Sequence, residues 1–307
     1  RGPVNCTYGV TASATYNALL HITDRDIPSN HGCYQPVNII APPGTIVNVE
    51  YPGASVGGNS EIHPHLVMAI YGALKDAMPD RVSAFDGGTS ELLAIGGTHP
   101  DTHEVFANLS NEGCGWGGRA TKDGNDALCI PNGNCAIAPI EVLETRYPIL
   151  HRDFSLNEGS GGAGRNRGGL GYSREIEILS EEMRVSAFIE RNVIEPEGFF
   201  DGRPGKRSAF LVRAEGSDEF ETMKQAFNTK CDGKFSDAYM YEGDVIRMVT
   251  SGGGGYGDPL ERDFARIERD VAEGYLPRDQ VEAEYQVVLR PDGTVDPEAT
   301  ARLREQL

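Results

Sequence analysis

The chain has 307 residues, 39% of them hydrophobic and 24% charged, a composition typical of one large globular domain or two closely joined ones. Its formal net charge of −18 disfavours binding to nucleic acid and to anionic membranes, because both present phosphate groups. No apolar run approaches the roughly 18 residues of a membrane span, and residues 1–20 do not resemble a signal peptide. We therefore expect a cytoplasmic protein that binds neither nucleic acid nor membranes.

Residues 1–147 are predicted to mix helices and strands. The clearest helix is 61–80, where Leu66, Ile70 and Ala73 recur at helical spacing. Further helices are predicted at 11–22 and 139–149, and short strands at 37–52, 82–85, 91–95 and 103–109. The first residues resemble the middle of a domain, which leaves processing, a split gene and a fragment open. We expect exposed apolar surface that another chain covers.

The rest of the chain divides into a β-rich part, residues 148–258, and a helical tail, residues 259–307. Strands are predicted at 170–178, 183–189, 208–213 and 244–250, with turn residues that favour antiparallel pairing. Two apolar stripes predict helices in the tail: Leu260, Phe264, Ile267 and Val271, then Val281, Tyr285 and Val288. The predicted fold class is α+β, with mixed or antiparallel sheets, flanking helices and a helical C-terminal tail.

Four consecutive glycines precede the tail in the segment SGGGGYGDPLERD, residues 251–263. A P-loop would end in Gly-Lys-Ser/Thr, whose lysine and hydroxyl bind phosphate and magnesium. This segment instead continues with Asp258, a natural N-cap, and Pro259, which suits the first helical position. Glu261 and Asp263 add negative charge at the same helix start. We therefore predict a tight backbone passage before a self-capped helix, in preference to a phosphate site.

A second glycine cluster, GSGGAGRNRGG at residues 159–169, differs because Arg165 and Arg167 lie inside it. Backbone amides and guanidinium groups together can bind a carboxylate or a phosphate. The favoured interpretation is a bend that lets two segments approach closely, with the arginines in surface ion pairs. Arg165 and Arg167 remain candidate anion-binding residues.

Histidines and cysteines give no firm metal or zinc-ribbon signal. His99, Asp101 and His103 alternate as on a strand, but Pro100 interrupts it, so exposed turn residues are favoured over a metal site. The six cysteines include no CxxC pair, and we expect free, mostly buried thiols.

The stretch 111–135 is a long Gly-, Asn- and Asp-rich loop that contains the one tryptophan, Trp116. A loop of this length in a compact domain is typically functional or disordered, and its tryptophan and cysteines argue against disorder. Cys114 is the best candidate nucleophile, although a packed thiol is favoured because no neighbouring base can be named. The catalytic candidates of this loop are Glu112, Cys114, Arg119, Asp123 and Asn125.

Four segments together resemble the hydantoinase B/oxoprolinase family: NCTYGVTASATYNALL, PPGTIVNVEYPGA, GSGGAGRNRGGLGYSREI and GGGGYGDPLERD. The likeness runs from residue 1 to about 289 and corresponds to roughly the C-terminal half of a family member. The family includes B-type subunits of ATP-dependent hydantoinases, oxoprolinases, caprolactamases and acetone or acetophenone carboxylases. The last two segments are the most specific in combination.

The resemblance implies an ATP-dependent amidohydrolase that opens a cyclic amide through a phosphorylated intermediate and acts only within a multi-subunit complex. ATP and Mg²⁺ would be bound by a partner A-type subunit, and a divalent metal by the absent N-terminal half of the B-type subunit. The Asn-Asp-Pro and His-His-x-x-Asp-like motifs of that half do not occur here, so no metal ligand and no bound cofactor are assigned to this chain. Two alternatives stay open: a subunit of an ATP-dependent ketone carboxylase, and a non-catalytic half that docks the other chains.

Overall fold

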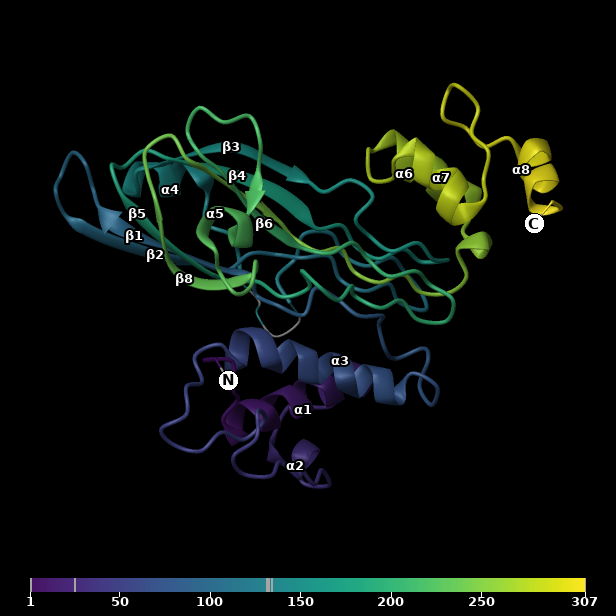
Figure 1. The fold of residues 1–307 in the computed structure, drawn as a ribbon. Helices are drawn as coiled ribbons and strands as arrows, with labels where there is room; N and C mark the ends of the chain where they lie inside the picture. The colour runs from purple at the N-terminus through teal and green to yellow at the C-terminus, as the bar shows by residue number, and fades with distance from the viewer. Residues whose placement is uncertain (1, 25, 131–132, 134, 307) are drawn as a thin grey trace.

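The structure is a computed structural model that describes residues 2–24, 26–130, 133 and 135–306. A β-sandwich lies at the upper left in Figure 1, helices α1 to α3 lie below it, and helices α6 to α8 lie at the upper right. The predicted α+β class with antiparallel sheets, flanking helices and a helical C-terminal tail is confirmed. Among the described residues, none of the helices is both long and apolar enough to cross a membrane.

The N-terminal helices pack on each other and on Phe199 and Tyr256 from later in the chain. Helix α1 (Tyr8–Ile22) packs on α3 (His63–Leu74), and α2 (His31–Tyr34) follows α1. Ala14 and Ala18 of α1 meet Val67 and Tyr71 of α3 in a shared core. The small side chains allow this close packing.

Two antiparallel sheets share the main core. One has the order β2-β1-β5-β8 and the other β3-β4-β9-β6-β7. Ile95 and Val185 from the first sheet pack with Ile176 and Ile246 from the second, so the sheets lie face to face. The bounds are β1 (Leu92–Thr98), β2 (Val105–Ser110), β3 (Ile149–Leu156), β4 (Tyr172–Ile178), β5 (Met183–Phe188), β6 (Ala209–Arg213), β7 (Glu221–Thr222), β8 (Lys234–Met240) and β9 (Val245–Val249). Two short helices, α4 (Ile140–Arg146) and α5 (Met223–Phe227), flank the sandwich.

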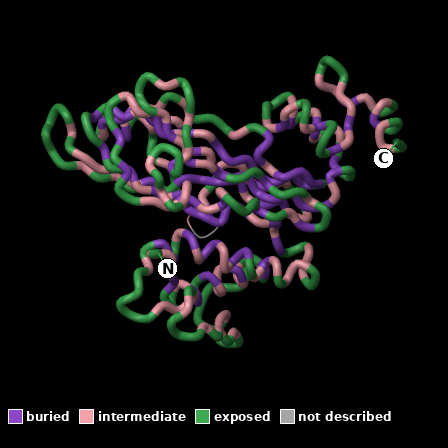
Figure 2. The backbone as a smooth tube through the Cα atoms, viewed as in Figure 1, coloured by how far each residue is buried: buried purple, intermediate pink, exposed green. Residues whose placement is uncertain are grey.

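The glycine-rich segments form a layer of extended chains between the sandwich and the C-terminal helices. Successive N–H groups of residues 252–257 donate in turn to neighbours on three sides. Gly252 and Gly255 donate to residues 203–206, Gly253 and Tyr256 to residues 166–169, and Gly254 and Gly257 to Phe85 and Phe199 respectively. A period of three is that of a polyproline II-type helix and differs from the period of two of a β-strand. These segments are mostly buried (Figure 2).

Glycine is required in this layer because backbone packs directly on backbone. A Cβ on Gly253 would lie 2.0 Å from the carbonyl oxygen of Trp116, and one on Gly255 would lie 2.0 Å from that of Ala163. The prediction that the glycine run is a tight backbone passage is therefore confirmed.

The C-terminal tail packs on this layer through helices α6 (Phe264–Ala272), α7 (Arg278–Tyr285) and α8 (Pro297–Arg304). Its core combines Ile267, Val281 and Tyr285 with Ala163 of the layer. Asp258 caps a short 3-10 turn, η2 (Pro259–Glu261), and a second cap, Asp263, begins α6. The helix start was therefore predicted five residues too early.

Several predicted elements differ from the structure. The strands expected at 37–52 and 82–85 are wrong: these segments hold only isolated bridges, Thr45 to Asn48 and Ser83 to Arg119. The helix expected at 61–80 begins as a π-helical turn, η1 (Gly58–Ile62), and ends at Leu74. Strands β3 and β8 were not predicted. The division at residues 147 and 258 stays a prediction, and the first sheet takes β1 and β2 from before residue 147.

Candidate functional site

A pocket of about 220 Å³ lies where the N-terminal helices meet the glycine-rich layer. Three parts of the chain form its walls: helices α1 and α3, the turn at residues 80–86, and the long loop predicted to be functional. The lining that carries chemistry is His21, Tyr71, Asp86, Trp116 and Arg119. Convergence of charged and aromatic groups from distant segments in a concave site is typical of small-molecule binding.

Arg119 is the loop candidate that reaches this pocket. Its guanidinium donates to Asn125 Oδ1 at 3.2 Å and lies 5.6 Å from the centre of the Trp116 ring. A bridge to Ser83 and an N–H bond to Lys122 O hold its backbone in place. Burial lowers the pKa of the Arg119 guanidinium, since desolvation opposes its charge.

Asp86 supplies a carboxyl group to the same pocket. It is 5% exposed, and its Oδ1 accepts from the backbone N–H of Gly88 at 2.8 Å. Burial raises the pKa of Asp86 to about 6, although the Gly88 bond and the positive charge of Arg191 oppose the change. A carboxyl group with a pKa near 6 can both accept and deliver a proton close to neutral pH.

His21 and Tyr71 close the helical side of the pocket. The His21 Nδ1 and the Tyr71 hydroxyl form a hydrogen bond between α1 and α3. Burial raises the pKa of the Tyr71 hydroxyl, with a further contribution from the negative charge of Asp86. The tyrosine is therefore a neutral hydrogen-bonding group at neutral pH.

Glu112 lies away from this pocket, in a polar network inside the sandwich. Its Oε1 accepts from Arg174 Nη1 at 2.7 Å and its Oε2 accepts from the hydroxyl of Tyr172. Arg174 Nη2 also bonds to His151 Nε2 at 2.6 Å, and His151 contacts Glu144. Glu112 and Arg174 are at most 2% exposed, so either one without the other would be a buried, unpaired charge.

The remaining candidates are also engaged by neighbours. Asp123 accepts from Arg262 and contacts Arg266. Cys114 is fully buried, and burial raises the pKa of its thiol well above the ordinary value. Arg165 forms the predicted surface pair with Glu261 at 3.2 Å. Arg167 differs from that prediction, because its side chain is buried and pairs with Asp126 and Asp270.

The comparisons with known proteins decide the family. The Hydantoinase B/oxoprolinase family model matches residues 1–259. The chain belongs to the hydantoinase B/oxoprolinase family. The resemblance inferred from the four sequence segments is thereby confirmed.

Individual members of the family cover nearly all of this chain. An uncharacterized protein of Methanocaldococcus jannaschii is 37% identical over 98% of it, and the caprolactamase subunit beta of Pseudomonas jessenii is 31% identical over 97%. The chain spans about half of each, 51%. The crystal structure of the ATP-dependent caprolactamase from Pseudomonas jessenii matches 98% of this chain with a TM-score of 0.83 and 27% identity, over 52% of that chain. A nucleotide-free acetone carboxylase structure shares the fold, with a TM-score of 0.79 and 19% identity over 99% of this chain and 44% of that one.

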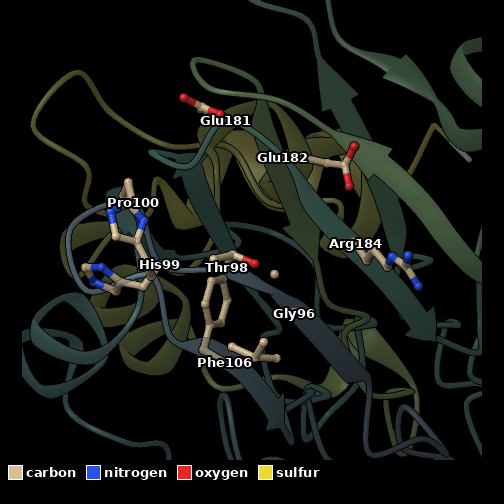
Figure 3. Close-up of a pocket in the computed structure, with 11 residues that line it drawn as sticks. Gly96, Thr98, His99, Pro100, Phe106, Glu181, Glu182 and Arg184 are labelled. Atoms are coloured by element: carbon tan, nitrogen blue, oxygen red, sulfur yellow. The ribbon is translucent and has the colours of Figure 1, made fainter.

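A second hollow, of about 730 Å³, lies at the turn between β1 and β2 (Figure 3). His99, Thr98 and Phe106 lie on one side of it, and Glu182 and Arg184 from the start of β5 lie on the other. The turn predicted around His99 and His103 is confirmed. Across the described ranges, no three His, Cys, Asp or Glu side chains are grouped to bind a metal ion.

The long loop singled out in the sequence brings Trp116 and Arg119 to this pocket, and Asn125 bonds to Arg119, but the residues opposite them were not singled out. His21 and Tyr71 lie on helices whose apolar faces dominate the signal, and nothing in the sequence brings them together. Asp86 carried one local signal, since Asp followed by Gly-Gly favours an Asx-type turn in which the carboxyl group bonds to the backbone.

Proposed function

We propose that this chain is the C-terminal portion of the B-type subunit of an ATP-dependent enzyme that opens a cyclic amide through a phosphorylated intermediate. The observation that carries the proposal is the match of 98% of the chain to half of an ATP-dependent caprolactamase, with a TM-score of 0.83. The pocket at Arg119 is the proposed binding place for the cyclic amide. Its volume of about 220 Å³ is below the roughly 300–1,000 Å³ of sites for drug-sized ligands, which suits a small single ring.

The proposed chemistry balances in three steps. The amide oxygen attacks the γ-phosphorus of ATP, ADP leaves, and the amide nitrogen loses its proton. Water then adds to the activated carbon, and the C–N bond breaks as the nitrogen takes up a proton, which leaves an acyl phosphate. A second water releases phosphate and the open-chain carboxylate. The net reaction consumes one ATP and two waters for each ring opened.

The pocket residues have roles that suit these steps. Arg119 offers positive charge to oxygens that become negative, and Asp86 has a carboxyl pKa of about 6 that suits proton transfer to the ring nitrogen. The Trp116 ring supplies an apolar wall, and enclosing a phosphorylated intermediate there excludes bulk water.

Energy coupling is assigned to other polypeptides in this proposal. The sequence has no P-loop, and ATP with Mg²⁺ is assigned to a hydantoinase A-type subunit. The N-terminal half of the B-type subunit is the second proposed partner and the proposed holder of a divalent metal. Ile40, Tyr51 and Val56 support such assembly, because these large apolar side chains are 83%, 99% and 74% exposed.

A substrate panel tests the proposed reaction. The assembled enzyme would be supplied with ATP and, in turn, hydantoin, 5-oxoproline, caprolactam, and acetone plus bicarbonate, with ADP and the organic product measured in each case. We expect ADP and ring-opened product in equal amounts from at least one cyclic amide. ADP formation with the ketone alone would support a carboxylase and overturn the hydrolase assignment. Formation of neither product by a correctly assembled complex would support a non-catalytic half.

A further inference from the structure

Arg119 is a half-buried cation, and no carboxylate among the described residues forms an ion pair with it. Its guanidinium contacts the Asn125 amide and the Trp116 ring. Two arginines that are buried in and beside the glycine-rich layer differ: Arg167 meets Asp126 and Asp270, and Arg262 meets Asp123 and Asp270. A partly desolvated guanidinium that lines a pocket and lacks a counter-ion is a binding group for an anion.

We propose that the pocket is an oxyanion subsite, in which Arg119 binds a carboxylate or phosphoryl group of a small ring substrate or of its activated form. The inference rests on the proposed function for the identity of the ring. The chemistry shared by the two ligand groups is a planar or tetrahedral set of oxygens that accepts two N–H bonds from one guanidinium.

The guanidinium is held in position before any ligand binds. The Trp116 ring faces it, Asn125 accepts one of its N–H bonds, and the backbone bridge to Ser83 fixes the residue from the other side. A preorganised donor loses little conformational freedom on binding, so more of the interaction appears as affinity. Ser83 and Thr121, which carry hydroxyl groups, also line the pocket.

Two acids line the same pocket and limit its affinity for anions. Asp80 is exposed, and water screens its charge. Asp86 is buried and is engaged by the N–H of Gly88. Its remaining charge repels an oxyanion bound nearby, so replacing it by the neutral amide in Asp86→Asn is expected to strengthen anion binding.

Trp116 provides a direct reporter, because it lines the pocket and is the one tryptophan in the sequence. The 307-residue chain would be titrated with three probes, 5-oxoproline anion, inorganic phosphate and neutral 2-pyrrolidinone, while tryptophan emission is followed. Ligand-observed saturation-transfer NMR would measure the same affinities independently of the emission baseline. We expect saturable binding of at least one anion and much weaker binding of 2-pyrrolidinone.

Variants identify the binding group. Arg119→Gln is expected to weaken anion binding about 10- to 100-fold, the range of a charge-assisted hydrogen bond, and Arg119→Lys to restore part of it. Asp86→Asn should tighten binding, a gain that a misfolded variant cannot mimic. Arg152→Gln, an exposed arginine paired with Glu177 on the sandwich, is the matched control and should leave affinity unchanged. Equal affinity for 2-pyrrolidinone and 5-oxoproline, or unchanged anion binding in folded Arg119→Gln, would overturn the proposal.

The titrations with different anions show which ligand group the subsite binds. Together with the activity assay, they test this inference separately from the proposed function. Binding of 5-oxoproline without phosphate assigns the subsite to a substrate carboxylate, and the reverse assigns it to the phosphoryl group of the intermediate. Anion binding through Arg119 without ATP-dependent ring opening in the assembled enzyme would retain the subsite and reject the reaction. Ring opening with the same KM in wild type and Arg119→Gln would retain the reaction and reject the subsite.

Discussion

The guanidinium of Arg262 bonds to both carboxylate oxygens of Asp123, at 2.9 and 3.0 Å, across 139 residues of sequence. Arg262 is fully buried and also contacts Asp270, which has no exposed surface either. Arg167 meets the same Asp270 from the glycine-rich layer at 3.3 Å. This network therefore connects the long loop, the glycine-rich layer and the C-terminal helices, and it gives Asp123 a structural partner.

Removing Arg262 should detach the C-terminal tail. Arg262→Ala removes the two-bond partner of Asp123 and one of the two arginines at buried Asp270, although Asp123 keeps Arg266 and Asp270 keeps Arg167. We expect a loss of about 3 kcal/mol in the free energy of unfolding. Urea unfolding measures the loss, and limited proteolysis should show earlier cleavage after residue 258. The control is Arg302→Ala in α8, where the side chain is 65% exposed and its pair with Glu298 spans 3.9 Å. That variant should change stability by less than about 0.5 kcal/mol, and equal losses in both variants would contradict the role of the network.

A single methyl group added in the glycine-rich layer should destabilise the protein strongly. Gly253→Ala places a Cβ 2.0 Å from the Trp116 carbonyl oxygen, a clash with backbone that no rotamer relieves. We expect a loss above about 4 kcal/mol or failure to fold, because backbone in a packed layer must move. Gly9→Ala is the matched control, since Gly9 lies in α1 and its Cβ would approach nothing closer than 3.9 Å. It should stabilise the protein by up to about 1 kcal/mol, and thermal unfolding of the two variants compares them directly.

Glu61 should make stability depend on pH. The residue lies in the π-helical turn with no exposed surface, its Oε2 accepts from Thr89, and burial raises the pKa of its carboxyl group from 4.5 to about 8. The folded state therefore holds a proton that the unfolded chain releases between those two values. Stability is greatest below pH 4.5 for this group and is lost as the pH rises through 8, by up to about 1.4 kcal/mol per pH unit.

Glu61→Gln tests that dependence, because the amide mimics the neutral acid and cannot ionise. The free energy of unfolding, measured in urea from pH 5 to pH 8, should fall less steeply with pH in this variant than in wild type. The difference in slope should correspond to the release of up to one proton on unfolding. Glu273→Gln, at an exposed glutamate after α6, should keep the wild-type slope. A wild-type slope in Glu61→Gln would show that this carboxyl group is ionised in the folded protein.

Glu112 and Arg174 should behave as a pair inside the sandwich. Glu112→Ala leaves the Arg174 charge buried without a carboxylate, and we expect a loss of about 3–5 kcal/mol. The double variant Glu112→Gln with Arg174→Met removes both charges and should recover most of that loss, as measured by urea unfolding. The single variants Glu112→Gln and Arg174→Met complete the cycle, and losses in them that simply add in the double variant would show that the two side chains do not depend on each other.

Strands with a regular pattern were predicted from the sequence, and irregular ones were not. In β4 and β6, buried and partly exposed residues alternate cleanly. In β3 the register shifts between His151 and Asp153, and in β8 Asp237 has a positive φ of 55°. Each irregularity breaks the period of two on which the prediction depends.

Only one wall of the candidate site could be predicted from the sequence, for a related reason. The length and composition of the long loop are local properties, and they selected Arg119 and Asn125. The opposing wall from His21, Tyr71 and Asp86 arises when α1 and α3 pack under the glycine-rich layer, through contacts such as that of His21 with Tyr71, 50 positions away. The backbone partners of the glycines are also distant in the sequence, so the need for close approach was predictable but the three-residue period was not.

The division of labour between this chain and its proposed partners is tested most directly by ATP turnover with and without them. Phosphate release would be measured with a cyclic amide for the 307-residue chain alone, and for the assembly with the A-type subunit and the N-terminal half of the B-type subunit. The account predicts no release above background by the chain alone, and amide-dependent release by the assembly that falls in Arg119→Gln. ATP hydrolysis by the isolated, monomeric chain would contradict it.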